Sequence, residues 1–370
     1  MDFNDILDTV IQKNASDLFI TADIPPSIKV HGRIIPVSKT RLDASQTREL
    51  TLSLMTPEQR DEFLHTKECN FAFTAKNIGR FRVSAFVQRD AVGMVLRRIE
   101  TRIPTFEGLG LPHTLQDLGM EKRGIVFFVG ATGTGKSTSL AAMVGYRNQN
   151  STGHIISIED PIEFLHSHAG CIVTQREVGI DTESYEVALK NTLRQAPDVI
   201  LIGEIRTREA MEHAITFAET GHLVLTTLHA NNANQALDRM LHFFPEEQHD
   251  QILMDLSMNL KGIVAQQLVR RPDGTGRRAI TEILLNTPLV ADLILKGDIP
   301  KLKELMKRST EHGMITFDQA LYDAFRRGEI TQEDALRHAD STNEVRLMIK
   351  LGDTRPNALN RDLGTMGLSD

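Results

Sequence analysis

Residues 125–138 read Ile125-Val126-Phe127-Phe128-Val129-Gly130-Ala131-Thr132-Gly133-Thr134-Gly135-Lys136-Ser137-Thr138. An apolar run, typical of a buried strand, passes directly into a G-x-x-x-x-G-K-[ST] pattern, and a helical stretch follows. The glycines allow a tight turn whose N–H groups point inward, and the helix adds the positive end of its dipole, so both features suit phosphate groups. We expect residues Gly130 to Thr138 to bind ATP, with Lys136 reaching the β- and γ-phosphates and the Ser137 hydroxyl ligating Mg²⁺.

Similar apolar runs recur further along the chain and alternate with amphipathic helical patterns. Short apolar runs bounded by glycine or charged residues indicate buried strands, and their alternation with helices is typical of a parallel, doubly wound sheet. The sequence therefore predicts an α/β fold for this region. The strand runs are 155–158, 199–202 and 223–225, and helical spacing joins Tyr185, Leu189 and Leu193 as well as Met211, Ile215 and Ala218.

The N-terminal part has a different pattern. A helical stripe opens the chain, and residues 80–87 alternate between apolar and polar side chains, which predicts a strand. A partner strand at 92–99 follows a turn near Arg89-Asp90, so we expect a small α+β domain. The stripe consists of Phe3, Ile6, Leu7, Val10 and Ile11, and the strand places Phe81, Val83, Ala85 and Val87 on one face and Arg80 and Arg82 on the other.

The length of 370 residues indicates more than one domain, since single cores seldom exceed roughly 250 to 300 residues. A stretch with prolines and glycines but no clear periodicity, from Glu100 to Pro112, has the composition of a linker. Strand patterns end near residue 285, and helical spacing follows. The predicted division is 1–98 for the N-terminal domain, 99–112 for the linker, 113–285 for the P-loop core, 286–351 for a C-terminal helical region and 352–370 for a flexible tail.

Composition and charge exclude several classes. The formal net charge is -7, so the chain lacks the basic footprint of a protein that neutralises many phosphates, and we expect no nucleic-acid partner. Cys69 and Cys171 have no metal-ligand spacing and are expected to be free thiols. The N-terminus does not have the pattern of a signal peptide, and no apolar run approaches the roughly twenty residues of a membrane span. We expect a cytoplasmic protein that could still dock on a membrane complex.

Two segments supply carboxylates for a nucleotide site. A P-loop enzyme needs an acidic group near Mg²⁺ and a residue that orients or deprotonates the attacking water. The run 199–204 is an apolar strand ending in Gly203-Glu204, the layout of a Walker B motif with glycine at the usual aspartate position, so Glu204 is the metal-side candidate. Residues 158–163 follow another strand, and Pro161 favours an extended approach that would aim Glu163 toward the nucleotide. Either acid could instead be a solvated loop residue.

Two histidines, His222 and His229, flank the run 223–228. A histidine can donate a hydrogen bond to a phosphate oxygen, and its titration range suits proton handling. A histidine at a strand end could equally be held by ordinary hydrogen bonds.

Taken in order, these segments resemble the secretion and motor ATPases of bacterial type II and type IV pilus systems. That family carries a Walker A loop, an aspartate box, a Walker B motif with glycine before glutamate, and a histidine box. The N-terminal segments 15–18 and 25–26 are similar to the retraction group represented by PilT and PilU. The segments that look like the four family motifs are 130–138, 158–163, 199–204 and 221–229.

The resemblance implies a homohexameric ring that hydrolyses ATP with Mg²⁺ and does mechanical work. In such a ring a PAS-like N-terminal domain packs against the RecA-like ATPase domain of a neighbour. Family arginines that act on a phosphate match Arg82 and Arg97, although Arg82 could equally belong to a solvated strand face. The further implied roles are catalytic base for Glu163, support of Mg²⁺ or water for Glu204, contact with the γ-phosphate for His229 and stabilisation of the site for His222.

Two departures separate the branches of the group. PilT proteins usually carry an Ala-Ile-Arg-Asn-Leu-Ile type motif after the core, which residues 300–306 do not match, and residues 227–239 look more like PilU than PilT. The PilU branch implies an accessory ATPase that depends on a PilT-type retraction ATPase, and a second implied partner is an inner-membrane pilus platform protein. Assembly ATPases carry a tetracysteine zinc site, which two distant cysteines cannot form.

The sequence thus favours a hexameric ATPase that supports type IV pilus retraction and twitching motility, located in the cytoplasm at the inner-membrane pilus machine. An alternative is a nucleotide-binding adaptor whose own hydrolysis is dispensable. A RecA-like nucleic-acid translocase is a third possibility, against which the acidic charge balance counts.

Overall fold

The structure is a computed structural model that describes residues 2–30, 32–76 and 78–358. It divides into two compact units. The first consists of residues up to Ile103 together with Ile162–His166, and the second of Pro104–Pro161 together with the chain from Ser167 onward. The division at Ile103 falls inside the predicted linker, whereas the assignment of residues 162–166 to the first unit has no counterpart in the sequence pattern.

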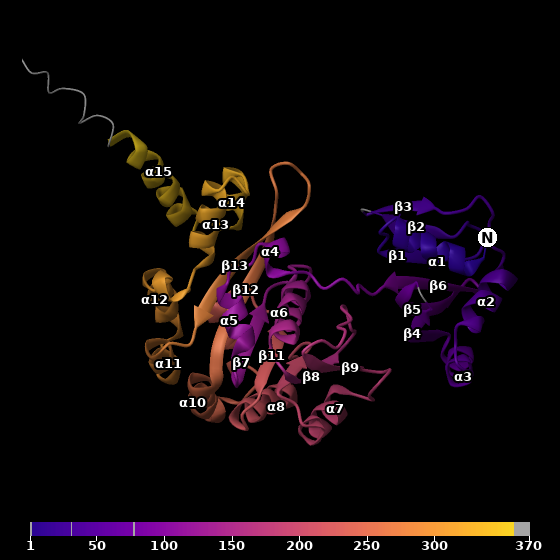
Figure 1. Cartoon of the computed structure of the whole chain (residues 1–370), viewed down its shortest axis with the longest axis horizontal. Coiled ribbons are helices and arrows are strands. Elements are labelled where there is room, and N and C mark those ends of the chain that lie inside the picture. The colour runs from indigo at the N-terminus through magenta and orange to yellow at the C-terminus, as the bar shows by residue number, and fades with distance from the viewer. Residues whose placement is uncertain (1, 31, 77, 359–370) are drawn as a thin grey trace, which may run out of the picture. The chain divides into compact units, whose positions relative to one another are not determined.

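The first unit, in its described residues, is an antiparallel sheet with three helices, in the strand order β3-β2-β1-β6-β5-β4 (Figure 1). The predicted N-terminal helix and the predicted strand pair are both present. The elements are α1 (Phe3–Gln12), β1 (Asp17–Ile20), β2 (Ser27–Val30), β3 (Arg33–Pro36), α2 (Ala44–Ser53), α3 (Pro57–Thr66), β4 (Glu68–Ala75), β5 (Gly79–Gln88) and β6 (Ala91–Arg98).

The β5–β6 hairpin illustrates how local chemistry fixes the first unit. Its loop is the pair Arg89 and Asp90, with φ of 47° and 63°. Positive φ at both residues of a two-residue loop matches the right-handed twist of the flanking strands. Phe81 and Val83 are fully buried, as the alternation predicts.

The second unit is built on a seven-stranded sheet of order β13-β12-β7-β11-β10-β8-β9 (Figure 1). All neighbouring strands are parallel except β13, which runs antiparallel to β12. The strands β9, β12 and β13 were not predicted. The elements up to the last strand are α4 (Phe106–Leu109), α5 (Thr114–Met120), β7 (Gly124–Val129), α6 (Lys136–Asn150), β8 (Gly153–Glu159), β9 (Cys171–Glu177), α7 (Tyr185–Thr192), η1 (Leu193–Gln195), β10 (Val199–Ile202), α8 (Arg208–Glu219), β11 (Leu223–Leu228), α9 (Ala233–Leu241), η2 (Glu246–Gln248), α10 (His249–Asn259), β12 (Leu260–Arg270) and β13 (Arg277–Leu285).

Strand β7 shows why its sequence is apolar throughout. Every residue from Gly124 to Val129 is buried, and alternate side chains enter two different cores. Phe127 belongs to the core that includes residues of α7 to α15 on one face, while Phe128 belongs to the core that includes residues of α4, α5 and α6 on the other. A strand covered on both faces needs apolar side chains at every position.

The C-terminal helices pack against the same core as α8 and α9. The predicted cluster of helices after residue 285 is therefore present. Helix α15 extends to Ala358, and residues 359–370 lie outside the described part of the chain, so the flexible tail from residue 352 stays a prediction. These elements are α11 (Pro288–Leu295), η3 (Ile299–Lys301), α12 (Leu302–Arg308), η4 (Thr310–His312), α13 (Phe317–Arg326), α14 (Gln332–His338) and α15 (Thr342–Ala358).

Candidate nucleotide-binding site

The glycine-rich turn joins the end of β7 to the start of α6, as predicted. Gly130 and Gly135 have φ of 153° and 84°, a region that side chains rarely adopt. A Cβ on Gly130 would lie 2.6 Å from the backbone carbonyl oxygen of Gln266. A Cβ on Gly135 would lie 2.9 Å from the side-chain nitrogen Nε2 of Gln266. The turn therefore needs glycine at both places to approach β12 this closely.

Lys136 is the first residue of α6, and its ammonium lies against the turn. Its Nζ donates to the carbonyls of Gly130 at 2.8 Å and Ala131 at 2.9 Å, and Thr134 Oγ1 donates to the same Ala131 carbonyl at 2.9 Å. The N-terminus of α6 and a cation thus face one small loop. This combination fits phosphate groups, and Ser137 in the first turn of α6 supplies a hydroxyl that fits Mg²⁺.

The structure brings the predicted Glu204 and His229 together. Glu204 follows β10, His229 follows β11, and these two neighbouring strands are parallel, so their carboxyl ends share one sheet edge. His229 Nε2 lies 2.8 Å from Glu204 Oε1, and His229 Nδ1 lies 3.4 Å from the Gly130 carbonyl oxygen. His229 therefore connects the Walker B carboxylate to the phosphate loop.

Arg206 completes this group and was missed in the sequence. Its guanidinium donates to Glu204 Oε2 at 2.7 Å, while the Glu204 side chain is only 15% exposed. The hydrogen bond and charge of Glu204 raise the pKa of Arg206 above its ordinary value. The position of Arg206, two residues after the Walker B glutamate, was the available signal. Glu204 is thus held between one histidine and one arginine.

The crowded surroundings of Gly203 explain why this position does not carry the usual Walker B aspartate. A Cβ at this position would meet the Tyr185 hydroxyl oxygen at 2.9 Å and the Glu159 Cα at 3.2 Å. Burial raises the pKa of Tyr185, and the charges of Asp160, Glu159 and Glu204 add to the shift. A phenol in these surroundings keeps its proton and remains a donor. The hydroxyl thus lies beside the backbone position from which an aspartate would project.

Gln266 on β12 is a second residue that the sequence analysis missed. It is 2% exposed, its Nε2 donates to the Thr134 carbonyl at 2.8 Å, and its Oε1 accepts from Ser139 Oγ at 2.8 Å. The amide therefore ties the turn and the first part of α6 to β12. A pair of glutamines inside the apolar run 263–269 was the only local signal.

His222 is not brought to this site, contrary to the prediction. It precedes β11, and its carbonyl accepts from the N–H of Gly124, the first residue of β7. The six residues of β11 lie between it and His229, so the two histidines are about 23 Å apart along the strand, at about 3.3 Å per residue. Its Nδ1 contacts Thr220 Oγ1 at 3.1 Å and the Phe217 carbonyl at 3.0 Å, so it closes the turn after α8.

The predicted Glu163 lies in the short segment 162–166 that belongs to the first unit. The neighbouring Phe164 forms a parallel bridge with Glu100, and the N–H of Leu165 donates to the Glu100 carbonyl at 3.1 Å. The Glu163 side chain is exposed. The segment after Pro161 thus pairs with the chain around Glu100, and the direction of Glu163 toward a nucleotide stays a prediction.

The predicted arginines also lie in the first unit, opposite each other. Arg82 on β5 and Arg97 on β6 are partners in the antiparallel register. Arg97 Nε donates to Asp17 Oδ1 at 2.8 Å, and that carboxylate is nearly buried. Like charges directly opposite each other repel, and Asp17 offsets one of the two.

Cys69 and Cys171 are buried free thiols, as predicted. Within residues 2–30, 32–76 and 78–358, no three His, Cys, Asp or Glu side chains gather as they would around a metal ion. No helix in these described ranges has both the length and the apolar character needed to cross a bilayer.

Residues 1–337 match the family described as Type II/IV secretion system protein, and the chain belongs to that family. It is 69% identical to the type IV pilus ATPase PilU of Pseudomonas aeruginosa over 352 residues, which cover 95% of this chain and 92% of PilU. It is 38% identical to the type IV pilus retraction ATPase PilT of the same organism over 339 residues, covering 92% and 98% of the two chains.

The crystal structure of the pilus retraction motor PilT with bound ADP superposes with a TM-score of 0.88 at 37% identity, covering 94% of this chain and 99% of that one. The predicted relationship to the PilT/PilU group is confirmed, and the identities agree with the predicted PilU branch. The predicted α/β fold is confirmed as well.

Proposed function

We propose that this chain is an ATPase that supports type IV pilus retraction and twitching motility. The observation that carries the proposal is the place of His229 between the phosphate loop and Glu204 at the carboxyl edge of the sheet, with one ring nitrogen 3.4 Å from the Gly130 carbonyl oxygen and the other 2.8 Å from Glu204 Oε1. Ligands of open parallel sheets bind at this edge. The identity to PilU and PilT supports the choice of process.

The chain's own residues divide the work of binding. Backbone N–H groups of residues 130–138 hold the β- and γ-phosphates of ATP, and Lys136 leaves the loop carbonyls to pair with them. Ser137 and Glu204 would hold Mg²⁺, which would neutralise charge on the phosphates. His229 contacts the γ-phosphate, so its contacts with Glu204 and the loop change when the γ-phosphate is bound.

The remaining roles follow from the family resemblance. Glu163 acts as the catalytic base, supported by its exposed position after β8. Arg82 and Arg97 act on a phosphate, supported by the paired positive charge that their register creates. Removing such an arginine costs about 10³ to 10⁵ in rate in related systems.

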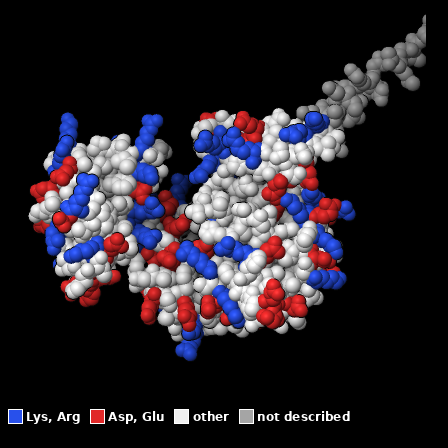
Figure 2. Space-filling view, turned by 180° about the vertical axis from the view of Figure 1, so that it is seen from behind, with Lys and Arg blue, Asp and Glu red and all other residues white. Residues whose placement is uncertain are grey.

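We propose the same assembly that the resemblance implies. Six copies form a ring in which the first unit is a PAS-like domain and the second a RecA-like ATPase domain. The ring lies in the cytoplasm, contacts the inner-membrane pilus platform protein and assists a PilT-type ATPase. Acidic and basic side chains are interspersed on the face shown in Figure 2, and the net charge is -7, so nucleic acid is not proposed as a partner.

The test combines turnover with retraction in cells. Lys136→Ala is expected to lose nucleotide binding, and Glu163→Ala to keep binding and the ring but lose ATP turnover and retraction. If Glu163→Ala leaves retraction unchanged while Lys136→Ala abolishes it, the chain is a nucleotide-binding adaptor. Retraction sustained by this protein in cells lacking a PilT-type ATPase would overturn the accessory role.

A further inference from the structure

A buried carboxylate outside the nucleotide site joins two helices to the sheet. Glu282 lies on β13 and is 2% exposed. Its Oε1 accepts from the N–H of Ala233 at 2.9 Å and its Oε2 from the N–H of Phe317 at 3.3 Å; these are the first residues of α9 and α13. Helix N-termini carry unsatisfied N–H groups and partial positive charge. One side chain therefore fixes two helix ends relative to the sheet.

The first of these helix ends leads directly to the nucleotide site. Ala233 follows His229 by four residues, and the segment between them is braced by side chains. Asn232 accepts from the N–H of Gln235 at 2.9 Å, and Gln235 Oε1 accepts from the N–H of Asn231 at 3.2 Å. A short segment, hydrogen-bonded at Asn231 and Asn232, thus joins His229 to α9.

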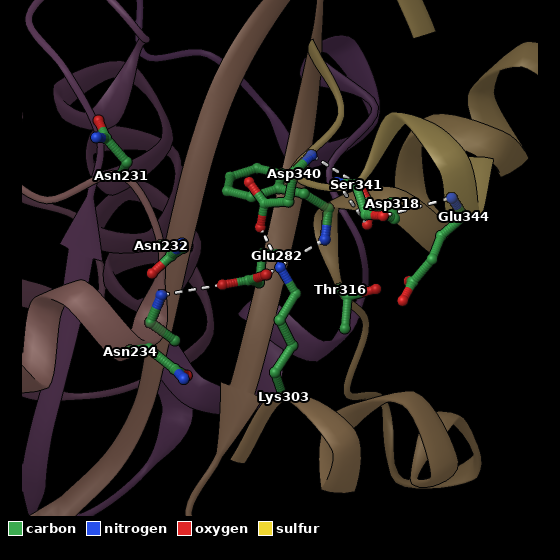
Figure 3. Close-up of polar contacts among 12 residues, drawn as sticks. Asn231, Asn232, Asn234, Glu282, Lys303, Thr316, Asp318, Asp340, Ser341 and Glu344 are labelled. Atoms are coloured by element: carbon green, nitrogen blue, oxygen red, sulfur yellow. Dashed lines mark hydrogen bonds and ion pairs between the residues drawn. The ribbon is translucent and has the colours of Figure 1, made fainter. Parts of the chain in front are cut away.

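The second helix end belongs to a charged cluster among the C-terminal helices. Figure 3 shows Glu282 between the asparagine segment on one side and Asp318, Asp340 and Lys303 on the other. Asp318 accepts from the N–H groups of Asp340 at 2.9 Å and Ser341 at 3.1 Å, and Lys303 donates to the Asp340 carboxylate. The start of α13 is therefore connected to α12 and to the segment before α15.

The electrostatic balance shows that this arrangement is costly. Burial raises the pKa of Glu282, the N–H of Ala233 opposes the shift, Asp340 adds to it, and Lys303 and the N–H of Phe317 oppose it. A buried carboxylate stabilises a fold only when such partners remain in place. If one of the two helix ends moves, the other must therefore move with it, or a buried hydrogen bond to Glu282 breaks.

We propose that Glu282 is a positioning residue that couples the His229–Asn232 segment to the C-terminal helices, so that nucleotide binding alters the start of α13. The proposal rests on the proposed nucleotide-binding function. Coupling between sites in proteins usually amounts to about 5- to 150-fold in affinity.

The experiment is amide hydrogen exchange on the purified full chain, with and without a non-hydrolysable ATP analogue and Mg²⁺. In the unchanged protein, the analogue is expected to change exchange in residues 229–241 and also in 317–326. In Glu282→Gln, an amide nitrogen replaces one acceptor oxygen, so the response at 229–241 should persist while the response at 317–326 is lost. ATP turnover should also fall in kcat, with little change in KM.

The matched control is Asp318→Asn. Asp318 is also a buried carboxylate that accepts backbone N–H groups in the cluster, but it makes no hydrogen bond to α9 in the described structure. It should lower the melting temperature as Glu282→Gln does, yet keep both exchange responses and kcat. Equal loss of kcat in the two variants, matched in stability, would show that Glu282 is merely structural.

The outcomes separate the two proposals. No analogue binding and no response at either segment overturns the proposed function. Binding with a response at 229–241 but none at 317–326 in the unchanged protein overturns the coupling alone. An unchanged response at 317–326 in a folded Glu282→Gln also overturns the coupling. If that variant does not fold, the response of the unchanged protein at 317–326 decides.

Discussion

Glu204 and Glu282 are both shielded carboxylates of the second unit, but their partners differ. Glu204 is 15% exposed in its side chain and is held by the side chains of His229 and Arg206. Glu282 is 2% exposed and is held by the backbone N–H groups of Ala233 and Phe317. Side chains can change rotamer when a ligand arrives, whereas the first N–H group of a helix moves only with its helix.

This difference gives the two carboxylates different roles within one domain, a chemical role for Glu204 and a structural role for Glu282. A carboxylate gripped by mobile, charged side chains at the edge of a sheet can exchange those partners for a metal ion or water. A carboxylate that accepts hydrogen bonds from helix N-termini can only transmit or resist the movement of those helices. Substitutions at the first place should therefore change rates more than stability, and substitutions at the second should change both.

The largest expected effect is on turnover in Glu204→Gln. The neutral amide keeps the shape but weakens the bond to Arg206 and the hold on Mg²⁺, so kcat should fall about 10² to 10³-fold. Steady-state ATP hydrolysis measures this change. Thermal unfolding of the same variant is the control, and a large loss of stability with unchanged kcat would erase the distinction between the two carboxylates.

Gln266→Leu should give the next largest effect, because Gln266 supports the loop through neutral hydrogen bonds. The substitution leaves the Thr134 carbonyl and the Ser139 hydroxyl without this partner. A buried group that loses its partner costs about 1–3 kcal/mol. Urea unfolding measures the loss, and nucleotide affinity should fall as well. Gln267→Leu, at the adjacent and less buried position, should have the smaller effect; the reverse order would contradict the support assigned to Gln266.

Gly203→Ala tests how closely Glu204 is positioned. The new methyl group would press on the Tyr185 hydroxyl and the backbone of β8, at a cost of about 1–3 kcal/mol. We expect reduced turnover, partly restored when Tyr185→Phe removes the hydroxyl. Turnover of the single and double variants measures this. Failure of the second substitution to restore any activity would mean that the backbone contact, not the hydroxyl, excludes a side chain at Gly203.

The smallest expected effect is in the pH dependence of stability. The pKa of Glu282 is raised above 4.5 in the folded chain, mainly by burial. The folded state therefore holds this proton at pH values where the unfolded state has lost it, so the group's contribution to stability is greatest below pH 4.5 and falls as pH rises through the raised pKa. The stability of the unchanged protein relative to Glu282→Gln should fall over this window, by up to about 1.4 kcal/mol per pH unit.

Denaturant unfolding between pH 4.5 and 8 measures this difference. Glu219→Gln, at the exposed end of α8, gives the baseline for a carboxylate outside both clusters. If the stability of the unchanged protein relative to Glu282→Gln rises with pH, the hydrogen bonds to Glu282 outweigh its burial.

Parts of the site could be predicted because their signal is local. The phosphate loop is contiguous, and Glu204 and His229 each follow an apolar strand, so the rule for parallel sheets places them at one edge. The same rule would have placed His222 at the opposite edge, because it precedes its strand. Arg206 was missed although it stands next to the motif.

Other parts have no local signal. Gln266 supports the loop from 132 positions away along the chain, and β12 was not predicted as a strand. The pairing of residues 162–166 with Glu100 likewise depends on which segments meet in space.

The sequence by itself determined the α/β fold, the phosphate loop and the family, because strand hydrophobicity, glycine geometry and motif order are properties of neighbouring residues. Only the tertiary structure decided which polar side chains share a partner. Glu204 meets His229 through the order of the strands, and Glu282 meets two helix ends through packing. Hydrogen bonds and charges act over a few ångströms in space, so these contacts cannot be inferred from the separation of the residues along the chain.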